Sequence, residues 1–90
     1  MTIHVTQVEI DIAKELCKST YSSSQLIFLS EFNPVALAMS KHYRAQCHAF
    51  CDTLYIDSFM LKIQTPTIVG ELLARYCSHG MKPFSFDIQD

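Results

Sequence analysis

The chain has 90 residues, of which 49% are hydrophobic and 18% are charged, and its formal net charge is -2. This length corresponds to a single domain, 1–90. A slightly negative charge argues against a nucleic-acid-binding surface, which requires a basic face. Soluble domains carry about 25% charged residues, and so short a chain cannot bury all of its apolar side chains. We therefore expect exposed apolar surface that contacts a partner.

The sequence also predicts a cytoplasmic protein without a membrane segment. Acidic residues between Glu9 and Glu15 lie where a secretory signal would be apolar. Apolar runs such as Leu26–Leu29 are far shorter than the roughly 18 residues that a membrane span needs. The cysteines are therefore expected as reduced thiols. They are Cys17, Cys47, Cys51 and Cys77.

The first predicted element is an amphipathic helix over Thr6–Thr20. Thr6 and Glu9 have the spacing of a capping box. A strand within Thr2–Ile12 is the alternative, because apolar residues alternate there and Ile10 does not fit the helical face. The predicted buried face of the helix consists of Val8, Ile12, Ala13, Leu16 and Cys17.

A loop at Tyr21–Ser24 and a short helix over Gln25–Phe32 are expected next. Asn33-Pro34 then predicts a helix start, because asparagine is a good N-cap and proline suits the first helical position. This helix is predicted to continue to Leu54, since its apolar residues form one stripe. The stripe consists of Val35, Met39, Tyr43, Cys47, Phe50, Cys51 and Leu54.

The helical phase is lost near Asp57-Ser58, where the helix kinks or ends, or where a strand over Ser58–Gln64 follows. A second cap-and-proline pair, Thr65-Pro66, predicts a last helix from Pro66 to Ser78, which Gly80 ends. The alternating tail Phe84–Ile88 is expected to be extended and to dock as an edge strand or across a helix groove.

Together these elements predict a mainly α fold, a compact four-helix single domain with a short extended C-terminal tail. The alternative is an α+β fold, in which the N-terminus (Thr2–Ile12), residues 58–64 and residues 84–88 form a small sheet. The two differ in whether short apolar runs are helical or extended, which periodicity alone does not decide.

No catalytic chemistry is evident, and no cofactor is expected. Gly70 and Gly80 are too far apart for a phosphate-binding loop, and no family signature surrounds any cysteine. The candidate zinc ligands are Cys47, Cys51, Cys77 and His79. Their spacing is unlike that of structural zinc sites, and all four cysteines fall on predicted apolar faces. Buried core thiols are therefore the preferred interpretation.

The aromatic residues favour association, because Tyr, Phe and Met are enriched in interface cores. We expect a small interaction or regulatory module, a homodimer that could also bind another protein. Burial of the same residues within one chain is the competing interpretation. The candidate interface residues are Tyr55, Ile56, Phe59, Met60, Phe84 and Phe86.

Two alternative functions remain at this point. One is a dimeric helix-turn-helix-like DNA-binding regulator, in which Thr65–Gly80 presents Arg75, Ser78 and His79. Phosphate contacts supply much of the affinity of such proteins, and here they would be few. The other is a zinc-stapled domain built on the cysteine and histidine set.

Overall fold

The computed structural model describes residues 1–18 and 32–88, and the side chains of all of these except residues 17, 18, 77 and 78. The described elements include three helices and five strands in two antiparallel sheets, so the fold is α+β and the mainly α prediction is wrong. In chain order they are β1 (Thr2–Val5), α1 (Gln7–Lys18), α3 (Pro34–Tyr43), β2 (Cys47–Ala49), β3 (Thr53–Ile56), the 3-10 helix η1 (Asp57–Phe59), β4 (Leu61–Gln64), α4 (Thr67–His79) and β5 (Phe84–Asp87).

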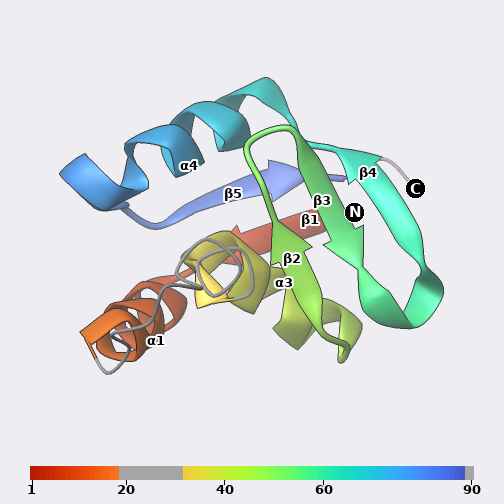
Figure 1. Ribbon diagram of the computed structural model, residues 1–90, viewed down its shortest axis with the longest axis horizontal. Coiled ribbons are helices and arrows are strands. Elements are labelled where there is room, and N and C mark those ends of the chain that lie inside the picture. The colour runs from red at the N-terminus through yellow and green to blue at the C-terminus, as the bar shows by residue number, and fades with distance from the viewer. Residues whose placement is uncertain (19–31, 89–90) are drawn as a thin grey trace.

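The two sheets separate the ends of the chain from its middle (Figure 1). Strands β1 and β5 pair antiparallel, with Ile3 opposite Phe86. Strands β2, β3 and β4 follow one another as a meander. The α+β alternative placed residues 58–64 in one sheet with the two terminal segments, whereas the structure puts β4 in the other sheet.

Helix α1 and its capping box are confirmed. The Thr6 N–H donates to Glu9 Oε2 at 3.2 Å, and the Thr6 hydroxyl donates to the same oxygen. The predicted buried face is wrong, because Val8 and Ile12 are exposed while Ile10 is buried beside Ala13. The cap holds Glu9 in the interior, 3% exposed, so the helix face that carries Glu9, Ile10 and Ala13 is turned toward the core.

Helix α3 begins as predicted but ends eleven residues early. Asn33 Oδ1 accepts the Ala36 N–H at 2.8 Å, and Pro34 is the first helical residue. Arg44 then adopts the left-handed conformation (φ 54°, ψ 41°), and its N–H bonds to the Ser40 carbonyl. The chain turns there instead of continuing as a helix to Leu54.

A hairpin replaces the predicted second half of that helix. Cys47 and Ala49 are buried on either side of the half-buried His48, and Leu54 and Ile56 are buried on either side of Tyr55. This alternation is the period of a strand with one buried face. The helical stripe was misleading because Cys47 and Leu54, seven residues apart, fit both a helix face and two facing strands.

The C-terminal third of the chain agrees more closely with the predictions from the sequence. The strand alternative for residues 58–64 describes the structure, although β4 itself begins only at Leu61. Helix α4 and the extended tail are confirmed, with Gly80 at φ 70° ending α4 and the tail paired as β5. Thr65 does not cap α4, because its hydroxyl donates to the Phe50 carbonyl at 2.8 Å.

The core lies where α3 packs against α1, β1 and β2. The fully buried large side chains come from β1, α3, β2, β3 and α4, and are Ile3, Val5, Pro34, Val35, Met39, Cys47, Leu54, Ile56 and Val69. The predicted loop at Tyr21–Ser24 and the helix over Gln25–Phe32, apart from Phe32 itself, lie outside the described residues. Among the described helices, none combines the length and the apolar character needed to cross a membrane.

Asn33→Ala is expected to destabilise the protein by about 2–3 kcal/mol, because the substitution removes both the helix cap and the 2.9 Å bond from Asn33 Nδ2 to the Ala49 carbonyl. Urea unfolding measures this loss. The control Asn33→Ser keeps a cap but not the bond to Ala49, and should lie between the two. An Asn33→Ala midpoint equal to that of the wild type would contradict this account.

Gly70→Ala is expected to lower stability, although alanine usually adds about 1 kcal/mol in a helix interior. A Cβ at Gly70 would lie 2.6 Å from the Cys51 carbonyl oxygen, so α4 or the β2–β3 turn must move. Thermal unfolding, with the exposed Glu71→Ala as control, measures the change. A stabilised Gly70→Ala protein would show that this contact is not close.

Candidate functional site

Three consecutive large apolar side chains are exposed where β3 connects to β4. Phe59 is 61% exposed, Met60 81% and Leu61 40%, and we call these three residues the β3–β4 patch. Such runs on a surface are unfavourable unless they are used. The local backbone fixes them, because Met60 is left-handed (φ 49°) and its N–H bonds to the Asp57 carbonyl at 3.1 Å, which ends η1 and turns the chain into β4.

The predicted interface residues divide into three groups. Phe59 and Met60 are exposed, whereas Tyr55 and Phe84 are half-buried. Ile56 and Phe86 are 0% and 5% exposed, so they belong to the core of the chain. Strand alternation explains this, because Ile56 ends β3 on its inner face and Phe86 lies in β5 opposite Ile3.

Besides Val8 and Ile12 on α1, the sequence analysis missed the exposure of three apolar residues in or next to the β2–β3–β4 sheet. Leu61 belongs to the β3–β4 patch, while Phe50 (46% exposed) and Ile68 (56% exposed) lie in the β2–β3 turn and the first turn of α4. Phe50 was assigned to the apolar stripe of the predicted long helix, and Ile68 lay in the predicted last helix, Pro66 to Ser78. A strand reading of residues 47–64 would have placed Phe50 at a turn.

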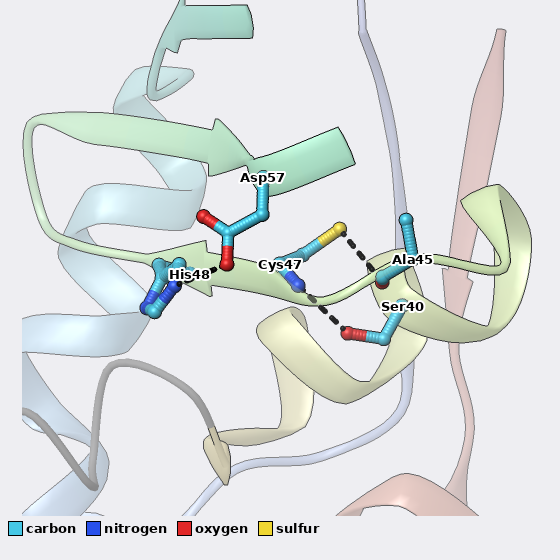
Figure 2. A network of polar contacts seen from close by, with 5 residues as sticks. All are labelled: Ser40, Ala45, Cys47, His48 and Asp57. Carbon is cyan, nitrogen blue, oxygen red and sulfur yellow. Dashed lines mark hydrogen bonds and ion pairs between the residues drawn. The ribbon is translucent and has the colours of Figure 1, made fainter. Parts of the chain in front are cut away.

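The outer face of the β2–β3–β4 sheet carries an aromatic cluster. The His48 ring stacks on Phe50 at a centroid distance of 6.4 Å and lies 5.9 Å from the Tyr55 ring across the strand pair. His48 Nε2 is 3.4 Å from Asp57 Oδ2 (Figure 2). Lys62 continues the row beside Tyr55 on β4.

Cys47 and His48 do not form a catalytic pair. They are neighbours on β2, so their side chains project to opposite faces of the sheet (Figure 2). Cys47 is fully buried, its Sγ donates to the Ala45 carbonyl at 3.5 Å, and burial raises the pKa of its thiol. A thiol with a raised pKa is a poor nucleophile at neutral pH.

The candidate zinc ligands are not arranged as predicted. Cys47 is buried in β2, as predicted for a core thiol, whereas Cys51 is exposed in the β2–β3 turn, so the prediction of a buried core thiol is wrong for Cys51. His79 is the last residue of α4, and the side chain of Cys77 lies outside the described part. Among the described residues, no group of three or more His, Cys, Asp or Glu side chains could hold a metal ion.

In the described residues, α4 is not the second helix of a helix-turn-helix motif. Strands β2, β3 and β4 separate α3 from α4, whereas that motif joins its helices by a short turn. Arg75 and His79 line an open cavity of about 840 Å³ together with Lys82. The cavity lies at the C-terminal end of α4, where the helix dipole is negative and opposes a phosphate.

Comparison of the chain with protein-family models, with curated proteins and with solved structures finds no match.

In the folded protein, Cys51 is expected to react with iodoacetamide at about pH 8 while Cys47 does not, because the Cys47 thiolate is disfavoured by burial. Tandem mass spectrometry of the peptide containing both residues measures each. The raised pKa keeps a proton on the folded state that the unfolded state releases, so stability should fall as the pH rises above about 8.5. Equal labelling of both cysteines would contradict this.

Proposed function

We propose that this chain is a small cytoplasmic protein-interaction module that acts as a homodimer, and that the β3–β4 patch is the surface buried on association. One observation carries the proposal, which is the exposure of Phe59, Met60 and Leu61 in a row. Exposed apolar patches rimmed by polar residues are typical of interaction sites. Exposed Asp57, Ser58 and Lys62 flank this patch in the chain.

The energetic reason for association is the hydrophobic effect. Complete burial of one large apolar side chain contributes roughly 1.5–3 kcal/mol, and a two-fold dimer buries each patch residue twice. Aromatic residues at the centre of an interface are the usual hot spots. Phe59 is therefore the residue whose loss should weaken the dimer most.

The cysteines support the cytoplasmic part of the proposal. The Cys47 and Cys51 thiols are not joined in a disulfide, and the core contains the reduced Cys47. Proteins of oxidising compartments usually pair their cysteines.

Phe59→Asp is expected to convert the dimer into a folded monomer, because a carboxylate cannot be buried in an apolar interface without a large desolvation penalty. Native mass spectrometry gives the oligomeric mass, and circular dichroism verifies the fold. Val8→Asp is the matched control, since Val8 is 58% exposed but lies on α1.

The control should remain dimeric. A wild-type chain that is monomeric, or a Phe59→Asp chain that is as dimeric as the control, would overturn the proposal.

A further inference from the structure

The two outer edges of the β2–β3–β4 sheet are treated differently by the rest of the chain. On the β2 side, the Phe50 N–H bonds to the Thr53 carbonyl at 2.8 Å, and the Asp57 N–H bonds to the Gln46 carbonyl at 3.0 Å. Antiparallel strands alternate the direction of their backbone groups. The N–H and C=O groups of Cys47 and Ala49 therefore point away from β3, toward the outside of the sheet.

Side chains of α3 and its N-cap residue bond to two of these outward groups. The Cys47 N–H donates to Ser40 Oγ at 3.2 Å (Figure 2), and the Ala49 carbonyl accepts from Asn33 Nδ2 at 2.9 Å. Helix α3, which packs against β2, thus occupies this edge.

Strand β4 forms the other edge. The Thr65 N–H bonds to the Asp52 carbonyl at 3.2 Å, which continues the β3–β4 register by one pair. By the same alternation, Leu61 and Ile63 bond toward β3, and the backbone N–H and C=O groups of Lys62 and Gln64 point away from the sheet. Within residues 1–18 and 32–88 no strand pairs with this edge, and β4 lies at the margin of the molecule (Figure 1).

We infer that a second copy of this chain pairs antiparallel with β4 and that the two three-stranded sheets join into one continuous sheet. The inference rests on the proposed function, because it identifies how the β3–β4 patch is buried. Lys62 of each copy lies opposite Gln64 of the other, and the two Ile63 residues face each other across the two-fold axis. Lys62 and Gln64 then exchange both of their outward hydrogen bonds.

The charge of Lys62 decides the register in which two copies of this edge pair. A register that placed the two Lys62 residues opposite each other would be destabilised by like charges. The register centred on Ile63 removes that repulsion, and both ammonium groups remain in water on the outer face. Lysine on an edge strand usually discourages pairing, and here it selects one register among the self-pairings.

The exposed apolar residues also match under this symmetry. The β3–β4 patch lies at the start of β4, and the exposed Ile68 lies just after its end, in the first turn of α4. Antiparallel pairing brings the start of one β4 strand beside the end of the other. Each patch therefore approaches Ile68 of the second copy, and the contact is the same on both sides, as a two-fold interface requires.

Amide hydrogen exchange of the wild-type chain, followed by NMR at several protein concentrations, tests the pairing without any substitution. The amides of Leu61 and Ile63 should be protected at every concentration, because they bond within the chain. The amides of Lys62 and Gln64 should be protected when the dimer forms and should lose protection on dilution below the dissociation constant.

A proline substitution tests the same hydrogen bonds through its effect on the oligomeric mass. Lys62→Pro removes an N–H that β3 does not use, so the intramolecular ladder is kept. It should raise the dimer dissociation constant at least about tenfold, because two symmetric hydrogen bonds are lost. The control Lys62→Ala keeps the N–H and should dimerise at least as well as the wild type.

The outcomes separate this inference from the proposed function. If a dimer forms and Phe59→Asp dissociates it, but the Lys62 and Gln64 amides exchange as fast as exposed ones, the β4 pairing is overturned and the proposed function stands. If the wild-type chain is monomeric even at about 1 mM, both are overturned. Concentration-dependent protection of these two amides, with a weakened Lys62→Pro dimer, supports both.

Discussion

The side chain of Asn33 is the constraint on which the arrangement of this protein depends. Its Oδ1 starts α3 by accepting the Ala36 N–H, and its Nδ2 closes the edge of β2 by donating to the Ala49 carbonyl. The residue is 4% exposed, so neither bond can be replaced easily by water. Since α3 packs against α1, β1 and β2, one amide fixes the position of the helix that joins the two sheets.

The sequence predicted the local half of this arrangement and missed the long-range half. Asn33-Pro34 and the Thr6/Glu9 box are short-range signals, and both caps form as expected. The end of α3 carried no such signal. Arg44 adopts the left-handed conformation that ends the helix, whereas this position is usually occupied by glycine or asparagine, which can be recognised in a sequence. The predicted helix therefore continued wrongly through residues 47–54. Only the pairing of β2 with β3 and of β3 with β4 makes this part of the chain extended.

The wrongly extended helix also affected the predicted interface residues. In a helix, Tyr55, Ile56, Phe59 and Met60 would share one side, but a strand ending at Ile56 buries that residue and leaves Phe59 and Met60 outside. The tail residue Phe86 is buried for a separate reason, because β5 pairs with β1 and Phe86 lies opposite Ile3. Composition alone correctly predicted that the chain has more apolar residues than its core can bury. This excess is a consequence of the short chain length and not of the fold.

Part of that excess lies on the β2–β3–β4 sheet, where the rest of the chain covers the strands unequally. Burial on the inner face is complete at Cys47 and Ile56 but falls to 40% exposure at Leu61, which lies beside them in register on β4. One copy of the chain thus covers two strands of the sheet and leaves the third partly bare. An apolar strip along an open edge can be buried either by more chain or by the same strip on another molecule. The side chains of Ser40 and Asn33 bond to the outer edge of β2, whereas the outward backbone groups of β4 are suited to pairing with another strand.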